Sequence, residues 1–174
     1  MPPDGATGAD LAGLTIRVAE PNEYDAIAAV LLAAYEQLDD PEFPGYRSEL
    51  RAVAKRAASC PVLVAVDSSG TVLGTVTYVP GPDTPLSEGE RDGEAGFRML
   101  AVDPAAHGKG IGRVLARTCI ERARSEGRTA VHLYTRPSMR VAHRLYESMG
   151  FERDRSRDWE FEPGEWLWSY HLAL

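Results

Sequence analysis

The sequence has few cysteines, no long apolar run and no basic leader. Cys60 and Cys119 are its two cysteines, too few for a disulfide framework, and are interpreted as unpaired, buried thiols of a cytoplasmic protein. No stretch approaches the roughly 20 apolar residues that span a bilayer, so no membrane association is expected. Residues 1–13 lack the apolar core of a signal peptide. We expect them to form a disordered tail ahead of one domain, residues 14–174.

Basic residues are fewer than acidic ones: the sequence has 19 Lys and Arg against 26 Asp and Glu, which gives a formal net charge of −7. Non-specific nucleic-acid binding depends on basic side chains that neutralise phosphates, so no nucleic-acid partner is expected. The acidity either steers a cationic substrate such as an amine or only keeps the protein soluble. His132, His143 and His171 lack the spacing of metal ligands, so no metal is expected.

Hydrophobic periodicity predicts a single α/β domain without internal repeats. The expected strands cover residues 14–19, 62–66, 72–79, 97–102, 130–134, 151–161 and 166–172. The expected helices cover about 22–38, 46–59, 111–126 and 137–149. Asn22 is expected to cap the first helix, and the turn at 68–70 to close a hairpin. The loop at 80–93 is either functional or a mobile surface loop.

The most informative segment is a glycine-rich turn between the strand at 97–102 and the following helix. Glycines at 108, 110 and 112 allow a ligand to approach the backbone, and the helix N-terminus offers unpaired N–H groups to phosphate. Lys109 and Arg113 add positive charge. A Walker A loop would need Ser or Thr at Gly110, and a dinucleotide fingerprint would need Gly at Arg113 or Leu115. A turn that only starts a helix is the remaining alternative.

Two sequence blocks extend this interpretation. AVDPAAHGKGIG at 101–112 and RVAHRLYESMGF at 140–151 resemble the GNAT superfamily of CoA-dependent N-acetyltransferases. His107, Gly110 and Gly112 match its pattern of Arg or Gln, two residues, Gly, one residue, then Gly or Ala. The second block matches its Ala-x-x-x-Tyr…Gly-Phe pattern through Ala142, Tyr146, Gly150 and Phe151.

The resemblance implies a twisted, mostly antiparallel sheet of 6–7 strands with helices on both faces. Strands 97–102 and 130–134 would splay apart, and acetyl-CoA would lie in the opening. The implied contacts are the strand backbone of Leu100, Ala101 and Val102 for pantetheine, and the turn residues for pyrophosphate. The turn residues are His107, Gly108, Lys109, Gly110, Ile111, Gly112 and Arg113.

An attacking amine must be neutral, and deprotonating a lysine-like amine at pH 7 costs about 4–5 kcal/mol, so a general base is expected. The resemblance assigns the general acid to Tyr146, whose alternative role is core packing. Many family members carry a strand Glu where this chain has Gly96. Glu94, two residues earlier on the same strand face, is the candidate base or else a plain surface carboxylate; Asp92 is weaker.

His107 replaces a permanently charged or amide side chain, and Met139 replaces a frequent Asn. These departures leave two functions open: a catalytic N-acetyltransferase acting on a small-molecule or protein amine, and a non-catalytic acyl-CoA sensor. Acetylation of aminoacyl-tRNA is disfavoured by the acidic charge. Homodimers are common in the family, and the resemblance favours one here. Core packing is expected for Trp159, Trp166 and Trp168, rather than an amine pocket, and a solvated segment for Arg153, Arg155 and Arg157.

Overall fold

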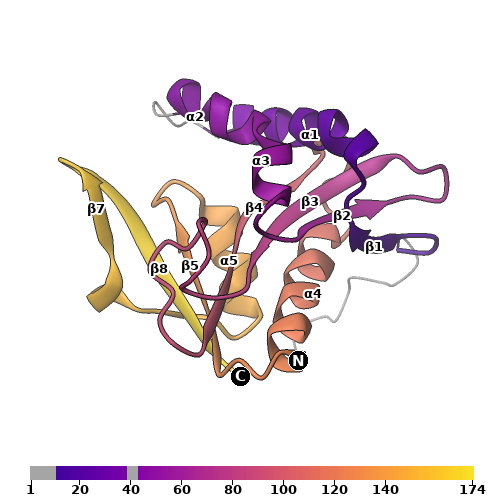
Figure 1. Cartoon of the computed structure of the whole chain (residues 1–174). Helices are drawn as coiled ribbons and strands as arrows, with labels where there is room; N and C mark the ends of the chain where they lie inside the picture. Colours follow the sequence, from indigo (N-terminus) through magenta and orange to yellow (C-terminus); the bar gives the residue numbers. More distant parts are fainter. Residues whose placement is uncertain (1–10, 39–42) are drawn as a thin grey trace, which may run out of the picture.

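A single twisted sheet forms the centre of the protein (Figure 1). The computed structural model describes residues 11–38 and 43–174, and after the gap it describes side chains from residue 45 onward. The described strands run in the order β1-β2-β3-β4-β5-β8-β6, with β7 paired to β8. Every pairing is antiparallel except β4 with β5. The bounds are β1 Thr15–Val18, β2 Val62–Val66, β3 Val72–Val79, β4 Glu94–Val102, β5 Ala130–Thr135, β6 Glu152–Arg153, β7 Trp159–Glu162 and β8 Glu165–Ala173.

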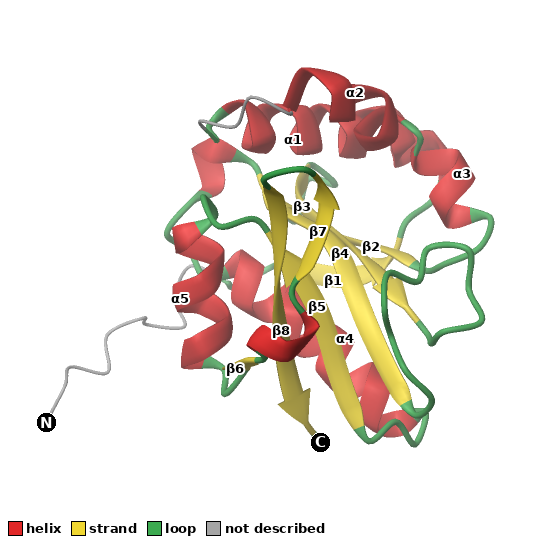
Figure 2. Ribbon diagram, turned by 90° about the vertical axis from the view of Figure 1, so that its left-hand side faces the viewer, coloured by secondary structure: helices red, strands yellow, loops and turns green. Residues whose placement is uncertain are grey.

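Helices cover both faces of this sheet, as Figure 2 shows. The helices are α1 Tyr24–Glu36, α2 Phe43–Arg51, α3 Val53–Ala57, α4 Ile111–Ser125 and α5 Arg140–Ser148. One apolar core joins the α1–α3 side to the sheet through Ile27, Leu31, Leu50 and Val53. The other core joins α4 and α5 to the opposite face. The predicted α/β architecture is confirmed. Within the described part of the chain, no helix is both long and apolar enough to cross a membrane.

The predicted splay between two central strands is present. β5 pairs with β4 in parallel only through the first three residues of β4, from Glu94 opposite Ala130 to Gly96 opposite His132. Beyond Gly96, β4 continues against β3 alone. A bulge then deflects β4, and Met99 takes a left-handed φ of 52°. We call the point where β4 and β5 part, at Gly96 and His132, the fork.

Several element boundaries differ from the predictions, two of them where a side chain bonds to the local backbone. Asn22 is not the cap of α1: a 3-10 turn, Pro21–Glu23, precedes the helix, and the Glu23 carboxylate accepts the Glu20 N–H at 2.7 Å. The helix expected at 46–59 is broken at Ala52 into α2 and α3. The strand expected at 151–161 is interrupted by a 3-10 turn, Arg155–Arg157, where the Asp154 carboxylate accepts the Ser156 N–H.

The expected disordered tail, residues 1–13, falls mostly outside the described residues. Leu11 is described, and it packs against the core on the α4 side together with Leu14. The two thiols are unpaired and buried, as the sequence analysis anticipated. Cys119 belongs to the α4 core.

Candidate functional site

The glycine-rich turn leaves β4 at Val102 and enters α4 at Ile111. Asp103 opens it by accepting the Ala105 N–H at 2.8 Å. Gly108 and Gly110 both have left-handed φ angles, 78° and 81°, which glycine adopts without strain. At both positions nothing lies within 4 Å of where a Cβ would stand. The backbone is therefore open to a ligand at these two glycines.

The start of α4 faces this open backbone. Its first N–H groups have no partner within the helix, and they form a natural anion site. Lys109 and Arg113 flank it, and the Arg113 guanidinium donates to Ser148 Oγ at 2.7 Å, which ties the start of α4 to the end of α5. Ile111, by contrast, buries its side chain in the core and can contribute only its backbone. These residues fit a pyrophosphate.

His107 does not point freely into the turn. Its Nε2 donates to the carbonyl oxygen of Val102 at 3.0 Å, so the imidazole folds back on the end of β4. Leu100, Ala101 and Val102 form the last stretch of β4 beyond the bulge. In the described chain no strand pairs with the β5-facing edge there. That edge can receive the amides of a pantetheine arm.

Tyr146 comes from α5 and packs beside β4 just beyond the fork. Its ring contacts Phe97 at a centroid distance of 5.8 Å and Phe151 at 5.7 Å. Burial raises the pKa of the Tyr146 hydroxyl, so it stays protonated at neutral pH. A protonated phenol can donate a proton.

Glu94 is placed very differently from an exposed base. It is buried, and its carboxylate forms a two-pronged ion pair with Arg157, with N–O distances of 2.8 Å. It also accepts the Arg91 N–H at 2.8 Å. Burial by itself would raise the Glu94 pKa, but these hydrogen bonds outweigh it, and the pKa lies below its ordinary value. Both oxygens are occupied, which does not favour a role as a proton acceptor.

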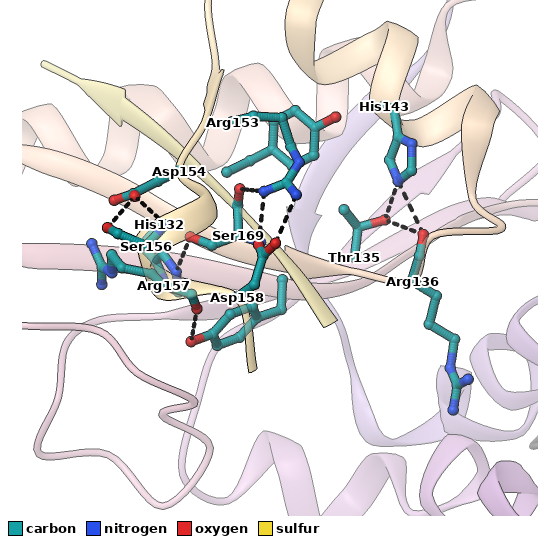
Figure 3. Close-up of polar contacts among 12 residues, drawn as sticks. His132, Thr135, Arg136, His143, Arg153, Asp154, Ser156, Arg157, Asp158 and Ser169 are labelled. Atoms are coloured by element: carbon teal, nitrogen blue, oxygen red, sulfur yellow. Dashed lines mark hydrogen bonds and ion pairs between the residues drawn. The ribbon is translucent and has the colours of Figure 1, made fainter. Parts of the chain in front are cut away.

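Two of the arginines expected on a solvated segment instead form ion pairs within the fold. Arg157 is buried against Glu94, and Arg153 pairs with both oxygens of Asp158 at 2.7 and 2.8 Å. Figure 3 shows Arg153 and Asp158 close to Ser169, whose N–H and carbonyl oxygen both join the network. The prediction of a solvated segment is wrong for these two residues, because alternating charges can pair across the fold as readily as face water.

The tryptophan prediction also fails in part. Trp159 and Trp166 are exposed, since the β7–β8 hairpin extends beyond the body of the sheet (Figure 1). Trp168 is partly buried and stacks on His143 with ring centroids 5.3 Å apart. His143, which the sequence analysis did not place in the core, is buried and bonds to Thr135 and Arg136 (Figure 3).

The loop at 80–93, left open between a functional and a mobile segment, is attached to the body of the protein. Arg98 of β4 pairs with Glu88 at 2.6 Å and donates to the Leu86 carbonyl. Arg157 donates to the Gly89 carbonyl at 2.7 Å. These contacts place Glu90 close to the fork. No local pattern in the sequence marks this residue, because its position depends on partners far along the chain.

Comparison with known proteins places the fold in a family. A model described as the acetyltransferase (GNAT) family matches residues 25–151. The chain belongs to this family. A mycothiol acetyltransferase from Thermomonospora curvata is 35% identical over 143 residues, covering 81% of this chain and 45% of that protein. The chain thus spans less than half of that relative.

Solved structures share the GNAT fold. A GCN5-related N-acetyltransferase from Kribbella flavida superposes with a TM-score of 0.69 at 24% identity, covering 94% of this chain and 99% of the other. A GNAT family acetyltransferase from Brucella melitensis in complex with acetyl-CoA superposes with a TM-score of 0.62 at 22% identity, covering 92% and 88%. At these identities the likeness establishes the fold alone.

Proposed function

We propose that this GNAT protein is an N-acetyltransferase that moves the acetyl group of acetyl-CoA onto a primary amine. The observation that carries the proposal is the succession of three features from the fork along β4 to the glycine-rich turn. An unpaired edge of β4 leads to the open turn at Gly108 and Gly110, and Tyr146 lies against Phe97, the first residue beyond the fork. The names of the relatives, and the acetyl-CoA complex of a structural neighbour, support the same donor.

Each part of the chain has a defined task in this proposal. The amides of residues 108–113 bind the pyrophosphate, and the free edge of Leu100 to Val102 aligns the pantetheine arm. A bound amine is then placed near the thioester, which saves the entropic cost of bringing two molecules together. Tyr146 donates a proton to the sulfur as the thiol leaves, because a thiol is a better leaving group than a thiolate in a water-poor site.

The acceptor is an amine by class. The chain carries a formal net charge of −7, and Glu90, which has no basic partner in the described chain, lies in the loop beside the fork. Tyr134 of β5 and the exposed Trp159 are aromatic neighbours with centroids 6.1 Å apart. Carboxylates and aromatic faces both favour a cationic amine over a neutral or anionic acceptor.

An acyl-CoA sensor on the same fold is the alternative, and the engaged state of Glu94 favours it. A site whose strand carboxylate is already neutralised by Arg157 could bind acetyl-CoA without activating an amine. Titration calorimetry with acetyl-CoA and with free CoA tests the shared part of both functions. Micromolar binding supports the site, and its absence in a folded sample would refute both.

Turnover separates the two. A panel of polyamines, amino acids, aminoglycosides and lysine peptides is incubated with acetyl-CoA, and thiol release is followed with a chromogenic disulfide. Amine-dependent release above acetyl-CoA hydrolysis supports the transferase. Tight binding without release on any amine would favour the sensor.

A further inference from the structure

Glu90 is a buried carboxylate whose two oxygens are in different situations. Oε2 accepts the Ser87 hydroxyl at 2.7 Å and the Glu88 N–H at 2.8 Å. In the described chain no residue donates a hydrogen bond to Oε1, and no basic side chain forms an ion pair with Glu90. Glu90 therefore has one oxygen that is firmly oriented and one that is available. Glu94, four residues later, has neither oxygen available.

Gly96 makes room for this carboxylate. A Cβ built on Gly96 would overlap Oε1 of Glu90 and would lie 2.8 Å from the carbonyl oxygen of His132. Any larger residue would collide with both. Since Gly96 is the last residue of β4 that pairs with β5, the free oxygen of Glu90 lies at the fork. A loop side chain thus occupies the space that a strand side chain at position 96 would otherwise take.

The segment that carries Glu90 is fixed from both sides of the fork. On one side, Arg98 of β4 binds Glu88 and the Leu86 carbonyl. On the other side, Arg157 binds the Gly89 carbonyl, and Tyr134 of β5 lies so close that a Cβ on Gly89 would be 3.0 Å from its hydroxyl. The peptide before Glu90 is therefore bonded to β4 and to the 3-10 turn Arg155–Arg157, and it lies against Tyr134 of β5. These bonds from other elements hold the loop carboxylate in position.

We propose that Glu90 is the proton acceptor for the amine in acetyl transfer, presented by the loop over Gly96. The inference rests on the proposed acetyltransferase function and goes beyond it by naming the base. Its basis is the available Oε1 at the fork, the glycine that accommodates it and the ties that fix the loop. Asp92, in the same loop, is exposed and has no such placement.

The proton balance is complete without another reagent. The ammonium form of the acceptor gives one proton, directly or through one water, to Glu90, and the resulting amine forms the C–N bond to the acetyl carbonyl carbon. The C–S bond breaks, its electron pair stays on sulfur, and the Tyr146 hydroxyl supplies the proton of the thiol. The second proton on nitrogen passes through water to restore the phenol. Glu90 then releases its proton to solvent, so the net products are amide, thiol and one proton.

The first test compares Glu90→Gln with Asp92→Asn, which removes the same charge from the exposed end of the loop. With the best amine of the panel, Glu90→Gln should lower kcat/KM by about 100-fold or more, the usual size of a general-base contribution. Its acetyl-CoA affinity by calorimetry should stay within twofold of wild type. Asp92→Asn should remain within twofold in both measurements. A Glu90→Gln enzyme within threefold of wild type in kcat/KM would overturn the proposal.

The second test guards against a structural effect. In Glu90→Ala the space over Gly96 is empty, so formate can take the place of the carboxylate. Added formate should raise the kcat/KM of Glu90→Ala at least tenfold and should leave the kcat/KM of Asp92→Asn unchanged. A purely structural Glu90 would show no such rescue, and the base role would fall even if the variant were inactive. Wild-type protein that binds acetyl-CoA but acetylates no amine would instead refute the proposed function, and the base role with it.

Discussion

The ring of Tyr146 lies edge-on to the ring of Phe97, 5.8 Å between centroids, so α5 delivers a phenol to the side of β4 just past the fork. The pKa of this phenol is raised by burial. A raised pKa keeps the hydroxyl protonated at neutral pH, so that its proton is present when the thiol leaves. The contact therefore connects the packing of α5 to the protonation step.

We expect Tyr146→Phe to lower kcat by about 100-fold or more with little change in the acetyl-CoA dissociation constant, because only the hydroxyl is lost. Tyr78→Phe is the control: its hydroxyl donates to Glu126 at the C-terminal end of α4, at 2.7 Å. That variant should keep its kcat. Steady-state kinetics and calorimetry measure both quantities. Equal kcat in Tyr146→Phe and wild type would remove Tyr146 from the mechanism.

The phosphate site is tested by placing a carboxylate on its backbone. Gly110→Asp should weaken CoA binding by at least 100-fold, since the new charge opposes the pyrophosphate where the amides must approach it. Gly127→Asp adds the same charge at a glycine with φ 73°, also open, at the other end of α4. It carries comparable backbone strain but should bind CoA normally. Calorimetry compares the two, and similar affinities would move the pyrophosphate elsewhere.

The Glu94–Arg157 pair should contribute to stability rather than catalysis. Arg157→Met leaves a buried carboxylate without its partner, which should cost about 3–5 kcal/mol of unfolding free energy. Arg155→Met, in the same 3-10 turn but exposed, should change stability by less than about 0.5 kcal/mol. Adding Glu94→Gln to Arg157→Met should recover part of the loss. Urea unfolding measures all four proteins, and a loss below about 1 kcal/mol in Arg157→Met would contradict the assignment.

His132 should make the protein lose stability in mild acid. Burial, assisted by the positive charge of Arg157, lowers the His132 pKa to about 4 in the folded protein. The unfolded chain takes up this proton near its ordinary value of 6.5, whereas the fold takes it up only near 4. The contribution of the neutral His132 to the free energy of unfolding is therefore complete above pH 6.5. It declines as the pH falls toward 4, by about 2 kcal/mol between pH 6.5 and 5.

The hydrogen bonding of the His132 ring is consistent with a lowered pKa. Nε2 of His132 is bonded to Ser169 at 2.9 Å, while Nδ1 is buried without a partner, so a second ring proton would have no acceptor in the described chain (Figure 3). Glu94, His171 and Asp154 are the other titratable groups that act on it. Urea unfolding of wild type and His132→Gln at pH 7 and pH 5 gives the difference. A pH slope that is unchanged in the variant would refute the attribution.

The sequence by itself determined the local parts of this protein. Apolar periodicity predicts α1 and α4, and β-branched runs around the turn at 68–70 predict the β2–β3 hairpin. Glycines 108 and 110 predict a turn whose backbone a ligand can approach, and at both positions nothing lies within 4 Å of where a Cβ would stand. These features follow from neighbouring residues, because side-chain spacing and backbone sterics act over a few positions.

The tertiary structure alone decided which charges meet. Glu94 became an ion pair because the chain returns 63 residues later to bring Arg157 against it. Glu90 reached the fork because Arg98 and Arg157, from two different parts of the chain, bind its loop. Alternating Arg and Asp after residue 150 could equally have faced water. Spacing along a chain specifies the faces of helices and strands, but the partner of a long charged side chain depends on how distant elements close over it.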